Sequence, residues 1–250
     1  MKNFSQTDLK PEILPFSNLK IGLIALSTDF TIEQDFKRIC NNQKVDIYVN
    51  RIPFNNPLNH ENYLKMVDHL PEIAKNILPG EKIDSIAYGC TSGTVAIGEK
   101  IIAEKIHQSK PNSYVSTPIT AAIKSFSKLK IKKLAVLTPY PKAVNKTIFN
   151  FLTKNGIEII SFSSFNLEYD SDIAKVNPKH LLRTINDLEY QNADAIFVSC
   201  TALRAVEILE QAEKDTSKIV ISSNQALVWD ILTSMKKTEE INGYGKLFLN

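Results

Sequence analysis

The hydrophobic positions of this chain alternate between short apolar runs and longer segments with helical spacing. Ile21–Leu26 reads IGLIAL and Ile83–Tyr88 reads IDSIAY, and turn residues follow each, as is typical of buried strands. Between them, Asn62–Leu78 carries apolar residues at helical spacing until Pro79 and Gly80 end it. Strands that alternate with helices predict a parallel sheet in an α/β fold. The first half also contains predicted strands at Val45–Val49 and Val115–Thr117 and a predicted helix at Ile119–Phe126.

The same pattern occurs a second time. Asp194–Thr201 (DAIFVSCT) matches Asp84–Thr91 (DSIAYGCT) at a distance of 110 residues, with the Asp, Ile, Cys and Thr coinciding. The repeat predicts two pseudo-symmetric lobes, each a four-stranded parallel sheet flanked by helices, with the active site in the cleft between them. We expect one lobe to comprise residues 19–123 and 224–250, and the other residues 124–223. The second-half strands are expected at Leu134–Leu137, Glu158–Phe162 and Ile219–Ser223 and within the matched segment Asp194–Thr201.

Composition narrows the class of protein. The 250 residues are 43% hydrophobic and 23% charged, which favours a globular domain over a disordered or fibrous chain. A net charge of +3 without a dense basic stretch argues against nucleic acid as a partner. No apolar run reaches the roughly 18 residues of a membrane span, and the first 18 residues carry no export signal. The expected location is therefore the cytoplasm, where cysteines stay reduced.

Two of the three cysteines stand at matched places. Cys90 and Cys200 each follow a predicted strand and precede a predicted helix, at the strand end where α/β folds bind ligands. A helix N-terminus favours the thiolate, and the free N–H groups of small residues such as Thr91, Ser92 and Thr201 suit a substrate carboxylate or an enolate. Two thiols facing one cleft could exchange protons on both faces of one carbon, or one could add to a double bond. Neither route needs a metal or an organic cofactor.

Other interpretations of the cysteines remain open. A lone cysteine is usually a small buried apolar residue, which is our expectation for Cys40. A redox dithiol lacks the Cys-x-x-Cys spacing, and three scattered cysteines do not form a zinc site. The chain could be a two-lobed protein that binds a small acid without turnover, or a decarboxylase or lyase in which only Cys200 delivers a proton. The repeat favours a functional pair, because chance rarely places two cysteines at matched strand ends.

Four motifs surround these residues and their neighbours in the predicted fold: Tyr-Gly-Cys90-Thr-Ser-Gly, Leu-Thr-Pro-Tyr140-Pro, Ser-Cys200-Thr-Ala-Leu-Arg and Ser-Ser-Asn224-Gln-Ala-Leu-Val-Trp. Through these motifs the sequence resembles the aspartate/glutamate racemase superfamily, on its maleate isomerase and arylmalonate decarboxylase branch, over almost the whole chain. Three further segments, Leu-Ser-Thr-Asp-Phe-Thr, Tyr-Val-Asn-Arg-Ile-Pro-Phe and the terminal Gly-Tyr-Gly-Lys-Leu-Phe, make it most similar within that branch to the ectoine-utilisation proteins of the EutA type.

The resemblance implies roles for individual residues. Cys90 and Cys200 match the catalytic pair of the isomerases and racemases, whereas arylmalonate decarboxylases lack the first of the two, so decarboxylation is the less expected reaction. Tyr140 matches a tyrosine that binds a substrate carboxylate. The family also implies a cofactor-independent enzyme that forms dimers or larger homo-oligomers. The other residues expected to bind substrate are Asp29, Thr91, Ser92, Asn145, Asn166 and Thr201.

Asp29 departs from the maleate isomerases, which have an asparagine at this position. An amide can donate a hydrogen bond to a dicarboxylate, whereas an ionised Asp repels it and suits a substrate ammonium. The sequence therefore favours an isomerase or racemase acting on a small carboxylic or amino acid, and the similarity to the ectoine-utilisation proteins suggests a role in ectoine catabolism. Maleate cis-trans isomerisation and an arylmalonate-decarboxylase-like lyase reaction are the alternatives.

Overall fold

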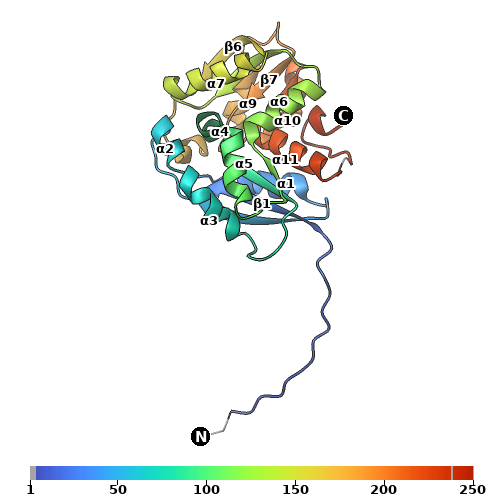
Figure 1. Ribbon diagram of the computed structural model, residues 1–250. Coiled ribbons are helices and arrows are strands. Elements are labelled where there is room, and N and C mark those ends of the chain that lie inside the picture. The colour runs from blue at the N-terminus through green and yellow to red at the C-terminus, as the bar shows by residue number, and fades with distance from the viewer. Residues whose placement is uncertain (1–3, 238, 250) are drawn as a thin grey trace.

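The computed structural model describes residues 4–237 and 239–249 and confirms the predicted α/β fold with two similar sheets (Figure 1). Both sheets are parallel and have the same strand order, so the internal repeat of the sequence is a repeat of structure. The first sheet has the order β2-β1-β3-β4 and contains β1 (Leu19–Leu26), β2 (Val45–Ile52), β3 (Ser85–Gly89) and β4 (Tyr114–Ser116). The second has the order β6-β5-β7-β8 and contains β5 (Lys133–Thr138), β6 (Glu158–Ser164), β7 (Ala195–Val198) and β8 (Ile219–Ser222).

Helices cover both faces of each sheet, and the central strands are buried as a result. Every residue of β3 and β7 is buried, whereas most residues of the edge strands β2 and β6 are half-buried. In the first half the helices are α1 (Ile32–Cys40), α2 (His60–Leu64), η1 (Val67–His69), α3 (Leu70–Lys75), α4 (Thr91–Ile97), α5 (Glu99–His107) and α6 (Pro118–Lys128). In the second half they are α7 (Lys142–Lys154), α8 (Asp170–Ile173), α9 (Pro178–Asn186), η2 (Val206–Ile208), α10 (Leu209–Thr216), α11 (Ser223–Ser234) and η3 (Lys246–Leu249).

One helix that was predicted as continuous is interrupted in the structure, so that prediction is wrong. The expected helix Asn62–Leu78 is divided into α2, η1 and α3. Pro71 explains the last break, because proline lacks an N–H and is tolerated in the first turn of a helix, where it stands in α3. The division leaves α2 as a separate short helix whose N-cap is Asn59.

The helix that follows the last strand of each half, α6 or α11, packs against the sheet of the other half. The Asp230 carboxylate of α11 accepts hydrogen bonds from the hydroxyls of Tyr114 and Ser116 in β4. The Phe126 ring of α6 makes an edge-to-face contact with Phe197 of β7, with 5.3 Å between ring centroids. This exchange joins the two sheets into one body. The residue limits expected for the two lobes stay a prediction.

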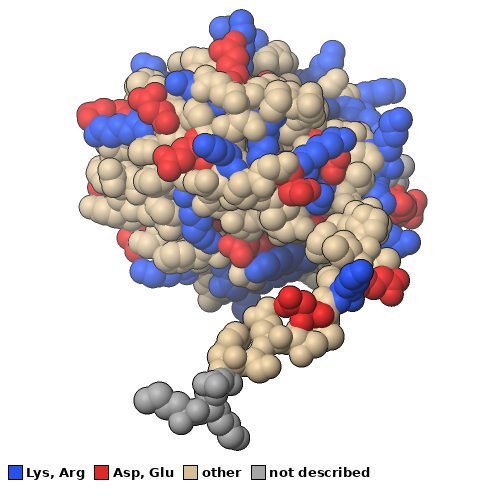
Figure 2. Space-filling view, turned by 60° about the horizontal axis from the view of Figure 1, so that its bottom comes forward, with Lys and Arg blue, Asp and Glu red and all other residues tan. Residues whose placement is uncertain are grey.

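The surface shown in Figure 2 mixes basic and acidic side chains over the body of the molecule. Within the described part of the chain, no helix has both the length and the apolar character required to cross a membrane. The same residues contain no cluster of three His, Cys, Asp or Glu side chains that could hold a metal ion.

Candidate active site

Cys90 follows β3 and is the N-cap of α4. Its Sγ accepts a hydrogen bond from the backbone N–H of Gly93 at 3.2 Å, and lies 3.9 Å from Ser92 Oγ. Glycine is required at position 93, because a Cβ there would stand 2.8 Å from the Cys90 sulfur. The start of a helix therefore faces Cys90, as predicted.

Cys200 follows β7, but the helix predicted directly after it is wrong. Residues 201–205 are not helical, and the first helical turn is η2. The carbonyls that would begin a helix bind distant segments instead: Ala202 O accepts from Thr31 Oγ1 of the first half, and Thr201 O accepts from Asn224 Nδ2 of α11, each at 2.8 Å. One amide still faces the sulfur, because Ala202 N–H donates to Cys200 Sγ at 3.4 Å.

The segments that carry the two cysteines meet across the halves. Thr201 Oγ1 donates to the carbonyl of Gly89 at 3.4 Å. Because Gly89 precedes Cys90 and Thr201 follows Cys200, both cysteines stand at one junction between the sheets. The hydroxyl of Thr91 donates across the same junction, to Ser223 Oγ at 2.9 Å.

Two buried tyrosines interact with both sulfurs. Burial raises the pKa of the Tyr140 hydroxyl, and the neighbouring Cys200 raises it further, with a smaller effect from Cys90. Burial likewise raises the pKa of Tyr63 in α2, followed by the effect of Cys90 and a smaller effect of Cys200. Each tyrosine therefore lies within electrostatic range of the whole pair, and the cysteines border one site.

Two buried carboxyl groups border this site as well. Asp29 Oδ1 accepts hydrogen bonds from the backbone N–H groups of Thr31 at 2.7 Å and Ile32 at 2.9 Å, whereas its buried Oδ2 has no partner among the described residues. Burial raises the pKa of Asp29, although those two amides, the neighbouring Thr201 hydroxyl and the Arg51 guanidinium all lower it. Asp170 accepts from Thr28 Oγ1 at 2.6 Å, and burial raises its pKa to about 6. Both carboxyls also raise the pKa values of the two cysteines.

Burial dominates the ionisation of the cysteines. It raises the pKa of Cys90 to about 12, and the Asp170 carboxylate adds to this effect, while the Gly93 N–H lowers the pKa. The pKa of Cys200 is also raised, first by burial, although the Tyr140 hydroxyl lowers it. Both side chains are therefore thiols at neutral pH in this closed site. The expectation that helix amides make a resting thiolate is outweighed by loss of water.

The predicted cleft is closed over the cysteines, which are only 3% and 4% exposed. The loops after β2 and β6 meet there: the Leu58 N–H donates to the Glu168 carbonyl at 3.0 Å, and the Asp170 N–H donates to Asn56 Oδ1 at 3.5 Å. A pocket of about 90 Å³ between α2, α4 and α7 reaches Tyr63 and Ser92. Substrate entry therefore requires these loops to open.

The structure places the two predicted asparagines differently from the other predicted residues. The Asn145 amide donates to the Tyr140 carbonyl at 2.6 Å and accepts from Thr138 Oγ1 at 2.5 Å, so it holds the turn behind Tyr140. Asn166 is exposed in the loop after β6, and its backbone N–H donates to Ser164 Oγ. The predicted residues that gather around the cysteines are Asp29, Thr91, Ser92, Tyr140 and Thr201.

Sequence reasoning missed Tyr63 and Asp170. Tyr63 lies on α2 and Asp170 begins α8, the short helices that follow the edge strand of each half. Neither residue belongs to a recognisable motif. The internal repeat was the available signal, because it makes these two helices equivalent and directs both toward the shared site.

Comparison with known proteins places this geometry in a family. A model of the arylmalonate decarboxylase family matches residues 56–248, a segment that contains both cysteines. The chain belongs to the arylmalonate decarboxylase family. This membership confirms the predicted branch of the superfamily, and with it the prediction that the chain is an enzyme.

Individual relatives match almost the full length. The maleate isomerase of Geobacillus stearothermophilus is 22% identical over 248 residues, which cover 92% of this chain and 97% of that protein. The structure of a maleate isomerase from Pseudomonas putida has a TM-score of 0.87 at 21% identity, covering 93% of this chain and 98% of the other. A cysteine-to-serine mutant of the Nocardia farcinica maleate cis-trans isomerase, which carries a covalently bound succinylcysteine intermediate, has a TM-score of 0.86 at 17% identity and the same coverage of both chains.

Proposed function

We propose that this protein is a cofactor-independent isomerase that converts a small cis-unsaturated dicarboxylate of the maleate class into its trans isomer. The observation that carries the proposal is the pair of buried cysteines at equivalent strand ends, with Tyr63 and Tyr140 close to both. The maleate isomerases among its relatives support the same class of substrate. This reaction was the alternative in the sequence analysis, and it is now the better supported one.

In the proposed mechanism the sulfur of Cys90 adds to one carbon of the double bond. The Cys90 thiol transfers its proton to a carboxylate of the bound dianion, which returns it to the sulfur at the end of the reaction. The carbon–sulfur bond forms, and the π electrons move to the neighbouring carbon, where the adjacent carboxylate delocalises them. The former double bond is now single and rotates. Elimination then expels the Cys90 thiolate and leaves the trans alkene. Cys200 approaches from the other half and can protonate and deprotonate the second carbon.

The geometry supports this division of roles. Cys90 has the N-terminal amides of α4 to stabilise a thiolate, whereas Cys200 has one amide and the Tyr140 hydroxyl. The succinylcysteine in the Nocardia farcinica mutant is a saturated sulfur adduct of the kind this mechanism forms. The hydroxyls and amides at Thr91 and Ser92 are suited to hold one substrate carboxylate.

Burial of Asp29 removes the charge repulsion that an ionised aspartate would exert on a dicarboxylate substrate. Because burial raises its pKa, the neutral acid is favoured, and a neutral carboxyl can donate a hydrogen bond as an amide does. The unpartnered Oδ2 is the atom available to carry that proton. Asp29 would then bind a substrate carboxylate instead of repelling it.

A direct assay tests the proposal. Purified protein is incubated with maleate, and proton NMR follows the cis and trans vinyl signals. We expect the cis signal to be replaced by the trans signal, with conversion at least about a hundredfold slower in Cys90→Ala and Cys200→Ala. Cys40→Ala is the matched control, because Cys40 is equally buried but lies at the end of α1, away from the pair. Binding of maleate without any conversion would contradict the proposal and favour a protein that only binds small acids.

Racemisation of an amino acid is the second candidate, and the carboxyl groups of Asp29 and Asp170 favour it. If both ionise, they would bind a substrate ammonium beside the two thiols. The same assay in D₂O, with amino acids, ectoine and N-acetyl-diaminobutyrate, separates the candidates. Deuterium exchange at an α-carbon without maleate turnover would select racemisation and support the similarity to ectoine-utilisation proteins. Release of CO₂ from an arylmalonate, lost only in Cys200→Ala, would select a lyase.

A further inference from the structure

Residues 4–18 form an extended arm that projects from the body before β1 (Figures 1 and 2). Its five large apolar side chains are 78% to 90% exposed, whereas the six other exposed large apolar side chains described are 40% to 58% exposed. A run of apolar side chains this exposed is unfavourable in water and typical of a segment that binds another surface. The five are Phe4, Leu9, Ile13, Leu14 and Phe16.

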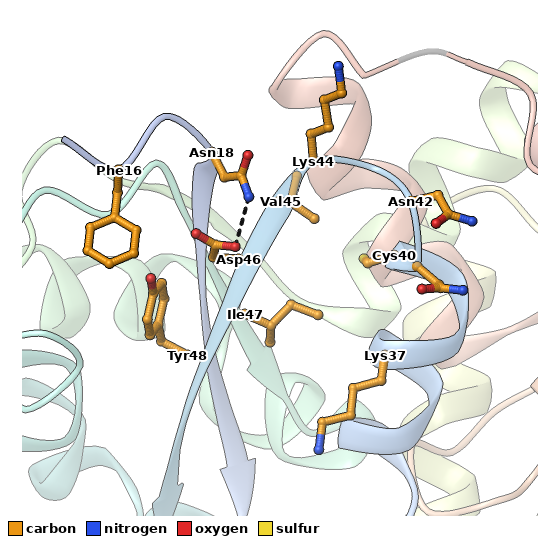
Figure 3. A pocket seen from close by; sticks show the side chains of 11 residues that line it. Phe16, Asn18, Lys37, Cys40, Asn42, Lys44, Val45, Asp46, Ile47 and Tyr48 are labelled. Atoms are coloured by element: carbon orange, nitrogen blue, oxygen red, sulfur yellow. Dashed lines mark hydrogen bonds between the residues drawn. The ribbon is translucent and has the colours of Figure 1, made fainter. Parts of the chain in front are cut away.

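A groove of about 960 Å³ begins where the arm leaves the body, along β2 and the end of α1 (Figure 3). β2 pairs only with β1, so the outer edge of β2 has no strand partner among the described residues. The half-buried Val45 and Ile47 alternate with Asp46 and Tyr48 along this strand, which gives the groove an apolar side. An exposed edge strand of this kind readily accepts another extended segment.

The arm has the form required to occupy such a groove. Pro11 and Pro15 prevent a helix and keep it extended. Fourteen extended residues span up to about 46 Å, more than the roughly 26 Å of an eight-residue strand. The acids Asp8 and Glu12 outnumber Lys10 in the arm, and the lysines Lys37 and Lys44 outnumber Asp46 in the lining of the groove, so the two surfaces differ in the sign of their net charge.

The root of the arm directs it away from its own groove. Asn18 Nδ2 donates to Asp46 Oδ1 at 3.0 Å, which fixes the chain against the first residues of β2 (Figure 3). From this point the arm runs outward from the body, and of its described residues Phe16 and Asn18, both next to β1, line the groove of its own copy. To follow β2 in its own copy, the arm would have to reverse direction within the few residues around Pro15.

We propose that residues 4–17 of one copy lie along the β2 edge and groove of a second copy, so that two chains exchange arms in a symmetric dimer. Each copy then supplies one arm and one groove, and the same contact occurs twice. The proposal is independent of the proposed reaction.

Sedimentation velocity over a range of concentrations tests the dimer. We expect the full chain to form a concentration-dependent dimer, and Ile13→Asp with Leu14→Asp in the arm to weaken it by about a hundredfold or more. Tyr48→Lys in the groove should have a similar effect. The matched control is Ile101→Asp on α5, an exposed apolar residue of the body, which should leave the dimer unchanged.

Mixing the variants tests the exchange itself. The Tyr48→Lys copy has an intact arm and the Ile13→Asp, Leu14→Asp copy has an intact groove, so the mixture should form a dimer although each variant alone is monomeric. The far-ultraviolet circular dichroism spectra of all variants should match that of the original protein, which shows that they are folded. A chain that is monomeric at every concentration, a dimer that survives both variants, or the absence of dimers in the mixture would overturn the proposal.

Discussion

The two halves of this molecule share a strand order but surround their cysteines differently. Cys90 caps a regular helix and receives the N–H of Gly93, whereas Cys200 is followed by five non-helical residues and receives the N–H of Ala202. Tyr140 adds a hydroxyl on the Cys200 side. A duplicated fold can therefore place equivalent atoms in unequal surroundings. In the proposed reaction this makes Cys90 the nucleophile and Cys200 the proton donor.

The largest expected effect comes from replacing the two cysteines themselves. Cys90→Ala and Cys200→Ala should each lower kcat by about 10²–10⁴-fold, the range for loss of a general acid or base. Only Cys200→Ala should accumulate a covalent adduct with maleate, because it retains the attacking sulfur. Intact-protein mass spectrometry measures the adduct, with Cys40→Ala as control. An adduct on Cys200 in the Cys90→Ala protein would reverse the assigned roles.

Gly93→Ala should produce the next largest effect, confined to the Cys90 side. A Cβ at position 93 would meet the Cys90 sulfur at 2.8 Å and the Tyr88 hydroxyl at 2.9 Å, so the sulfur must move. Misplacement of a reacting atom by about 1 Å can cost about 10²-fold in rate. Steady-state kinetics measure kcat. The equivalent position of the second half is Leu203, and retention of full activity by Gly93→Ala would show that the surroundings of Cys90 are not special.

The pH dependence of activity tests the role of Asp170, whose carboxylate raises the pKa values of both cysteines. Below its pKa of about 6 the carboxyl is neutral, and above it the carboxylate repels a dianionic substrate. We expect kcat/KM for maleate to fall by up to about tenfold per pH unit above that pKa. Asp170→Asn should weaken this fall, and measuring both proteins with the same substrate cancels the ionisation of maleate. Parallel profiles for the two proteins would remove Asp170 from the titration.

The smallest expected effect concerns α6 and α11, the two helices that pack against the sheet of the other half. The contact of α11 with β4 is polar, whereas the contact of α6 with β7 is apolar. Asp230 of α11 binds Tyr114, Ser116 and, at 3.0 Å, the Lys124 ammonium of α6. Asp230→Asn should lower the free energy of unfolding by about 1–3 kcal/mol, because buried donors lose a charged acceptor. Urea denaturation measures the change. Unchanged stability would show that the aromatic contact of Phe126 alone holds the exchange.

Local patterns of the sequence were sufficient to predict much of this protein. The spacing of the apolar residues predicted all eight strands, and most of the predicted strand ends lie within about two residues of the observed ends. This works because buried parallel strands leave short, nearly continuous apolar runs. The 110-residue repeat indicated two equivalent sheets and singled out Cys90 and Cys200. The same local patterns failed where distant segments compete for backbone groups, as at Ala202 and Thr201, whose carbonyls bind Thr31 and Asn224 instead of starting a helix.

The site residues divide in the same way. Tyr140 and Asp29 follow recognisable strands, so their positions at the strand ends were predictable from the chain alone. Tyr63 and Asp170 were not, since they reach the cysteines only after two loops close over the junction. The ionisation of these groups was also decided by the tertiary structure. The covalent sequence supplies thiols and carboxyls of ordinary pKa, and it is their removal from water in the closed interior that favours the neutral acids and the resting thiols.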